Sequence, residues 1–211
     1  MTEAEWLITS DHLALAALYM SAPAEVSERK ARLFASACLR AGIGTGWGGT
    51  NEELAELDLV ERYADRLMTR EELAHWYSQG KFGVLARQHG DPWDILLLLL
   101  DPRTGGKLIF QRACGNASEF WQQHVFPMEL LRDIFGNPFR PVSFDPAWRS
   151  SGVQLLAEGI YTDRAWDRLP ILADALQEAG CESADLLNHL RDPAATHVRG
   201  CWALDLVLGK E

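Results

Sequence analysis

The sequence predicts a mainly α-helical fold, and three observations support this class. Capping-box motifs, in which a Thr is followed three residues later by a Glu, stand ahead of apolar segments. Apolar residues then recur at three- and four-residue spacing over long stretches. Glycine and proline interrupt the pattern where these stretches end. We therefore expect a single multi-helix domain of roughly seven to ten helices over residues 1–211.

The first third of the chain carries clear helix signals. Thr-x-x-Glu capping boxes occur at positions 2–5 and 69–72, and Asp11 precedes another apolar stretch. Residues 25–42 and 52–67 place their apolar side chains on one face of a helix. This region is predicted to be a series of helices.

The middle of the chain allows two interpretations. Two apolar runs flank the polar, glycine-rich segment 101–106. Five consecutive leucines in the first run favour two helices, whereas the sequence KLIF in the second run favours a strand. We prefer helices, and a small β-hairpin near residues 94–111 is the alternative.

A proline-rich connector follows a short predicted helix at residues 128–135. Three prolines fall between residues 136 and 147, and their fixed φ angle and missing N–H exclude a helix. We expect an extended strap across one domain, although this connector could equally be a boundary between two sub-domains.

The remaining chain returns to helical spacing. A helix is predicted over residues 150–161, and a second is expected after Asp163 as its N-cap. Ser183 is expected to cap a third helix, and residues 197–209 form a predicted closing helix.

Composition and charge exclude several function classes. The net charge of −10 disfavours nucleic acid and anionic membrane surfaces as partners, because both attract clustered Lys and Arg. The N-terminus lacks the basic and apolar pattern of a signal peptide, and no apolar run is long enough to span a bilayer. Four cysteines in such a chain are expected to be reduced thiols. We therefore expect a soluble, acidic, cytoplasmic protein.

Two cysteines and two histidines lie close together near the C-terminus: Cys181, His189, His197 and Cys201. Zinc prefers four nitrogen or sulfur ligands in a tetrahedron, so these residue types suit a zinc site. His197 and Cys201 are four residues apart, which places both on one face if the closing helix begins early enough. On this interpretation the cofactor is Zn²⁺.

The same residues also suit plain packing, and their spacing favours that interpretation. The usual knuckle of two ligands separated by two to four residues is absent at the Cys181 end. Cys201 continues the apolar stripe of the predicted closing helix, where a buried cysteine behaves as a small hydrophobe. His189 is surrounded by leucines. On this interpretation the protein has no cofactor.

Motifs for other chemistry are weak. The glycine-rich segment 42–50 follows a predicted helix, whereas a phosphate-binding loop follows a strand. Cys114 has a neighbouring glycine, but no general base can be assigned to it, and His124 is near it only in sequence. Neither a GxSxG nor an HExxH motif occurs. The sequence therefore identifies no catalytic residue.

The segments LLRDIFGNPFRPVSFDPAW and HVRGCWALDLVLGKE resemble an abundant family of planctomycete bacterial proteins with no established activity. The start MTEAEW and the segment VERYADRL are similar to the same family. The likeness covers residues 1–10, 27–72 and 129–211, whereas residues 74–127 depart from the alanine-rich helical stretch typical of the family. The resemblance implies no catalytic residues. It does imply that two cysteines and one histidine, Cys181, His197 and Cys201, belong to the family pattern.

Three functional hypotheses follow. The first is a non-enzymatic protein-interaction or adaptor domain, because the sequence shows helices without a catalytic motif, a cofactor loop or a basic groove. The second is a helical domain stabilised by zinc at the Cys-His-His-Cys cluster. The third is an enzyme with a thiol or carboxylate site that the sequence does not display.

Overall fold

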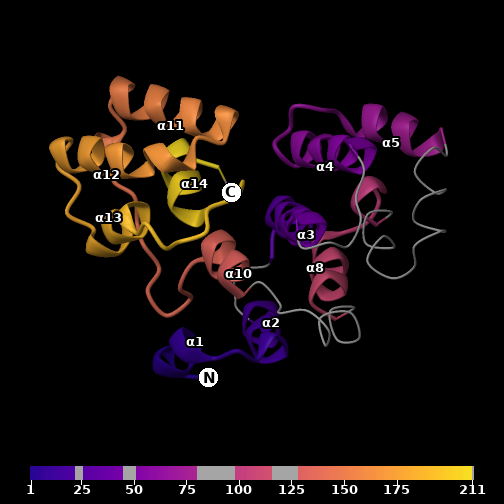
Figure 1. The fold of residues 1–211 in the computed structure, drawn as a ribbon, viewed down its shortest axis with the longest axis horizontal. Helices are drawn as coiled ribbons and strands as arrows, with labels where there is room; N and C mark the ends of the chain where they lie inside the picture. The colour runs from indigo at the N-terminus through magenta and orange to yellow at the C-terminus, as the bar shows by residue number, and fades with distance from the viewer. Residues whose placement is uncertain (22–25, 45–50, 80–97, 116–127, 211) are drawn as a thin grey trace. The chain divides into compact units, whose positions relative to one another are not determined.

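The computed structural model describes residues 1–21, 26–44, 51–79, 98–115 and 128–210. Within these ranges the chain is mainly helical and contains no β-strand, which confirms the predicted fold class (Figure 1). The contacts divide the chain into two compact units, Met1–Met128 and Glu129–Glu211. The proline-rich segment 136–147 lies inside the second unit, so the division does not fall at the connector where the sequence suggested a boundary.

The N-terminal unit contains helices that begin largely where the sequence predicted. The capping boxes are present, because the side chains of Thr2 and Thr69 accept the backbone N–H of Glu5 and Glu72. Asp11 also accepts backbone N–H groups at the start of its helix, as predicted. The helices are α1 (Glu3–Ile8), α2 (His12–Ser21), α3 (Glu28–Gly44), α4 (Asn51–Ala64), α5 (Arg70–Ser78) and α8 (Gly106–Gly115).

Helix α3 is central to the N-terminal unit and packs against α8 and α4. The rings of Phe34 and Phe110 lie 5.6 Å apart between their centroids across the α3–α8 contact. Gly106 lets the two helices approach closely, since a Cβ there would lie 2.7 Å from the Cα of Glu28. A larger residue at position 106 would therefore force the helices apart.

The hairpin alternative near residues 94–111 is wrong for the part that the structure describes. Residues 98–100 are helical, residues 101–105 form a turn, and α8 contains the KLIF sequence. The guanidinium of Arg32 donates to the carbonyl oxygens of Leu99, Asp101 and Thr104, which ends the first helical run and shapes the turn. Residues 94–97 lie outside the described ranges.

The C-terminal unit is a group of short helices (Figure 1), and its apolar core is formed by buried side chains between residues 153 and 207. The elements are α10 (Met128–Phe135), η1 (Pro146–Trp148), α11 (Ser151–Asp163), η2 (Trp166–Arg168), α12 (Leu169–Glu178), α13 (Ala184–Arg191) and α14 (Trp202–Leu208). Helix α12 packs against α11 and α13, and α14 packs against the same two helices.

Helix starts in this unit confirm some predictions and correct others. The Ser183 side chain accepts the N–H of Leu186 and caps α13, as predicted. Asp163, in contrast, is the last residue of α11 and caps nothing that follows. The chain turns at Arg164, whose φ is +53°, and passes through the 3-10 helix η2 before α12 begins.

The proline-rich segment has no helix over residues 136–145, as predicted. The prediction for residues 136–147 is wrong at its end, because the 3-10 helix η1 begins at Pro146, and the first turn of a helix tolerates proline. The side chains of Val142 and Phe144 in this segment pack against the apolar core. After it, the guanidinium of Arg149 donates to the carbonyl oxygens of Val207 and Leu206 at the end of α14, at 2.7 and 3.0 Å. The strap is thus tied to the end of the closing helix.

Candidate metal centre

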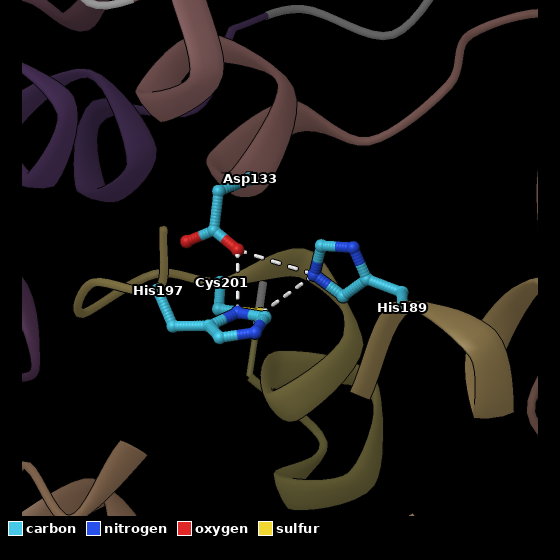
Figure 2. A group of neighbouring side chains, drawn as sticks. All are labelled: Asp133, His189, His197 and Cys201. Carbon is cyan, nitrogen blue, oxygen red and sulfur yellow. Dashed lines mark hydrogen bonds and ion pairs between the residues drawn. The ribbon is translucent and has the colours of Figure 1, made fainter. Parts of the chain in front are cut away.

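Four side chains from different parts of the C-terminal unit converge on one point (Figure 2). Asp133 lies on α10, His189 lies on α13, His197 lies in the segment between α13 and α14, and Cys201 immediately precedes α14. One nitrogen, oxygen or sulfur atom from each residue lies within 4.8 Å of those from the other three. These are ligand types that bind zinc.

Each of the four residues uses one and the same atom in its contacts with the others. Asp133 Oδ1 lies 3.1 Å from His189 Nε2 and 3.0 Å from His197 Nδ1. Cys201 Sγ lies 3.3 Å from His189 Nε2 and 3.8 Å from His197 Nδ1. Each histidine therefore directs a single ring nitrogen towards both the carboxylate and the sulfur.

The position of His189 follows from the amphipathic pattern of α13. Leu186, Leu187 and Leu190 are buried, and His189 lies at the edge of this apolar face. Its ring centroid lies 4.9 Å from that of Trp202, at the start of α14. The helix thus presents the imidazole towards the cluster while leaving part of it exposed.

A turn, and not a helix, brings His197 and Cys201 together. Helix α14 begins only at Trp202, so the expectation that both residues share one helix face is wrong. The N–H of Cys201 donates to the carbonyl of Val198 at 3.1 Å, and Gly200 has a φ of +91°. This positive φ favours glycine because a Cβ is strained there.

Asp133 is fastened by both carboxylate oxygens. Oδ1 meets the two imidazoles, and Oδ2 accepts the N–H of Val198 at 3.0 Å. Gly136 directly follows the last residue of α10, the helix that carries Asp133. It adopts a φ of +70°, and a Cβ there would lie 3.1 Å from the ring of Trp202. The end of α10 can therefore lie directly on the start of α14.

The electrostatics of the cluster are those of a buried carboxylate beside a buried thiol. Burial alone would raise the pKa of Asp133, but the hydrogen bonds and charges of His189 and His197 outweigh it and lower that pKa. Burial raises the pKa of Cys201 well above its ordinary value, and the Asp133 carboxylate adds to the effect. The backbone N–H groups of Leu204 and Ala203 hydrogen-bond the sulfur and act in the opposite direction.

The structure brings together three of the four residues that the sequence suggested as zinc ligands. Cys181 is not in the cluster and is buried in the apolar core of the C-terminal unit. Asp133 stands in the cluster in its place. The sequence did carry a signal for Asp133, because this acidic residue lies on the apolar face of α10, three residues after Leu130 and next to Ile134.

The remaining thiols show no sign of activation. Cys38 and Cys114 are buried in the N-terminal unit. Burial raises the pKa of Cys114 to about 12, so this thiol is protonated at neutral pH, whereas a nucleophilic cysteine requires a lowered pKa. His124, the nearest histidine after Cys114 in sequence, lies outside the described residues.

Comparisons with protein-family models, curated proteins and solved structures give no match to this chain. Among the residues that the structure describes, no helix combines the length and the apolar character needed to cross a membrane. The feature of the described residues that indicates a function is the cluster of Asp133, His189, His197 and Cys201.

Proposed function

We propose that the C-terminal unit binds one Zn²⁺ ion through Asp133 Oδ1, His189 Nε2, His197 Nδ1 and Cys201 Sγ, and that the ion stabilises this unit. The observation that carries the proposal is the convergence of these four donor atoms within 4.8 Å of one another. This is the zinc-stabilised domain considered from the sequence, with Asp133 replacing Cys181 as a ligand.

The separations between donor atoms suit a tetrahedral site. Zinc–ligand bonds of about 2.0–2.3 Å place the ligand atoms of a tetrahedron about 3.3–3.8 Å apart. Four of the six separations between these atoms run from 3.0 to 3.8 Å, and the other two lie within 4.8 Å. Side-chain adjustments would bring the remaining separations into the tetrahedral range.

Charge supports the same assignment. A carboxylate and a thiolate together balance the two positive charges of Zn²⁺, so a neutral complex would be buried. Without a cation, a thiolate beside the Asp133 carboxylate is disfavoured, as the raised pKa of Cys201 shows. The N–H groups of Ala203 and Leu204 nevertheless point at the sulfur, where they would stabilise a metal-bound thiolate.

The number of protein ligands favours a structural role over a catalytic one. Structural zinc sites are closed by four protein ligands, whereas catalytic sites keep one position for water or substrate. The four residues also come from three places in the chain: α10, α13 and the 192–201 segment that leads into α14. One ion would therefore connect elements that are far apart in sequence.

A metal-free hydrogen-bond network is the competing arrangement. In that network both imidazoles would donate N–H to Asp133 Oδ1. In this network the Cys201 thiol also donates to the Asp133 carboxylate, so His189 Nε2 and the Cys201 sulfur, which lie 3.3 Å apart, need no hydrogen between them. A shared cation satisfies all four atoms at once.

The test is elemental analysis of the purified chain together with thermal melts before and after treatment with a strong chelator. We expect one zinc per chain and a large fall in melting temperature after chelation, because structural zinc contributes directly to folding. Cys201→Ser and Asp133→Asn should each lose the metal.

Cys181→Ser is the matched control, because Cys181 is a buried cysteine of the same unit outside the cluster. It should keep a full complement of zinc even if packing is disturbed. A wild-type protein that takes up no zinc, cobalt or cadmium would refute the metal site and identify the cluster as a hydrogen-bond network. The protein-interaction role suggested by the sequence stays a prediction that this experiment does not address.

A further inference from the structure

The four residues of the candidate metal centre differ in how far they are exposed. The side chains of Asp133 and His197 are 2% and 6% exposed, and Cys201 is fully buried. The side chain of His189 is 19% exposed. Among the four side chains, His189 is therefore the most accessible to solvent.

The three buried residues are also tied to one another through the backbone. Val198, next to His197, donates its N–H to Asp133 Oδ2, and its carbonyl accepts the N–H of Cys201. Asp133, His197 and Cys201 are thus linked by the 197–201 turn, whereas His189 reaches the cluster from a separate helix, α13 (Figure 2). Loss of His189 would leave the other three donors in place.

We propose that His189 is the exchangeable ligand of this metal centre, and that a small neutral nitrogen donor can take its coordination position from solvent. The inference rests on the proposed zinc site. With His189 displaced, three protein ligands remain and the fourth position is open, which is the coordination pattern of zinc sites that bind external ligands. The structural centre would then be able to take up a small ligand at its exposed edge.

The experiment loads the full chain with Co²⁺ and uses imidazole as the external donor. The visible absorption of Co²⁺ reports coordination number, and its charge-transfer absorption from sulfur reports the bond to Cys201. His189→Ala should still bind one Co²⁺ with the sulfur signal present, at least about 10–100-fold more weakly, since loss of even an outer-shell partner costs that much. Added imidazole should restore the four-coordinate spectrum and tighten Co²⁺ binding.

Two control variants make the result specific. His197→Ala removes the less exposed imidazole, and added imidazole should not restore its spectrum. His75→Ala removes an exposed histidine of the N-terminal unit, and it should behave like wild type throughout.

The outcomes distinguish a failure of the exchange proposal from a failure of the metal site itself. If wild type binds Co²⁺ but His189→Ala loses it with and without imidazole, His189 is a required ligand and the exchange proposal is refuted while the metal site stands. Equal rescue of His189→Ala and His197→Ala also refutes it. If wild type binds no Co²⁺ with a sulfur signal, both proposals fail.

Discussion

The two units of this protein bury charge in opposite ways. In the N-terminal unit, Arg32 is fully buried and its guanidinium is surrounded by acceptors. It donates to the carbonyl oxygens of Leu99, Asp101 and Thr104, and to the carboxylate of Glu28 at 3.0 Å. Here the chain supplies both the cation and the oxygen atoms that surround it.

The C-terminal unit instead buries a carboxylate among side chains of the types that bind metals, and its two neighbouring histidines are charged only when protonated. Asp133, His189, His197 and Cys201 direct a carboxylate oxygen, two imidazole nitrogens and a sulfur to one point. In both places several polar groups face a common centre: the four ligand atoms here, and the oxygen atoms that accept from the Arg32 guanidinium in the N-terminal unit. The difference is that the oxygen atoms around Arg32 surround a permanent positive charge, whereas the histidines beside Asp133 are charged only when protonated.

This contrast explains why one unit is expected to depend on metal and the other is not. A buried charge is tolerated when it is paired and hydrogen-bonded, and it is strongly destabilising when its partner is removed. In the N-terminal unit, the oxygen atoms that compensate the buried charge of Arg32 belong to the chain itself, so they cannot be removed by a chelator. In the C-terminal unit the proposed compensation is an ion that can be removed.

Metal removal is expected to have the largest effect and to distinguish the two units most clearly. Structural zinc supplies about 10–16 kcal/mol of apparent folding free energy in zinc-finger peptides. After chelation we expect faster amide hydrogen exchange in α10, α13 and residues 192–201, with unchanged protection in α3 and α8. Mass spectrometry of exchanged peptides measures both units in one sample. An equal loss of protection in the two units would contradict the contrast.

Removing the buried guanidinium should have the next largest effect, on the N-terminal unit. Arg32→Met keeps much of the side-chain length but removes the guanidinium donor from the carbonyls of Leu99, Asp101 and Thr104. We expect a loss of about 3–5 kcal/mol in the free energy of unfolding, measured by urea denaturation, with unchanged metal content.

Arg103→Met is the control for Arg32→Met, since the Arg103 side chain is 75% exposed and forms a solvent-exposed ion pair with Asp101. It should leave the urea midpoint close to that of wild type, because exposed ion pairs contribute little. If the two variants are equally stable, the buried guanidinium is not what holds the 99–104 turn.

The smallest expected effect comes from a pair of glycines in the C-terminal unit. Gly200 and Gly180 both have a φ of +91°, but only Gly200 lies in the turn between His197 and Cys201. An alanine at either position should cost about 1–2 kcal/mol of stability through backbone strain. Gly200→Ala should also weaken zinc binding by about 10-fold or more, because it displaces two ligands.

Gly180→Ala should bind zinc as wild type does, because it shares the strain without touching the site; a Cβ there would meet nothing within 4 Å. Competition with a coloured zinc chelator measures both affinities. Equal zinc affinities in the two alanine variants would show that the 197–201 turn does not position the ligands.

Local sequence determined most of the helices. The Thr2, Thr69 and Ser183 caps act within three residues of the helix start, so their hydrogen bonds could be predicted without knowledge of the rest of the chain. Pro138 and Pro141 lie in chain without helix for the same local reason, whereas Pro146 begins a 3-10 helix, whose first position tolerates proline. The mainly α fold class follows from such signals.

Structural features that depend on contacts between residues far apart in sequence were predicted less well. The choice between helices and a hairpin at residues 98–111 depends in part on Arg32, which binds carbonyls 67 to 72 residues away in sequence. Residues 197–209 have helical spacing, yet the turn ending at Cys201 is held by a bond from Val198 to Asp133, 65 residues earlier. Propensity within the segment does not contain this contact.

The candidate metal centre was therefore only partly visible in the sequence. The residue types and order identified His189, His197 and Cys201 as candidates, because zinc chemistry restricts ligands to few side chains. Only the tertiary structure placed Asp133 in the cluster and Cys181 in the apolar core. The physical reason is that a ligand set depends on which side chains packing brings within a few ångströms, and α10 meets α13 and the 197–201 turn only in the folded unit.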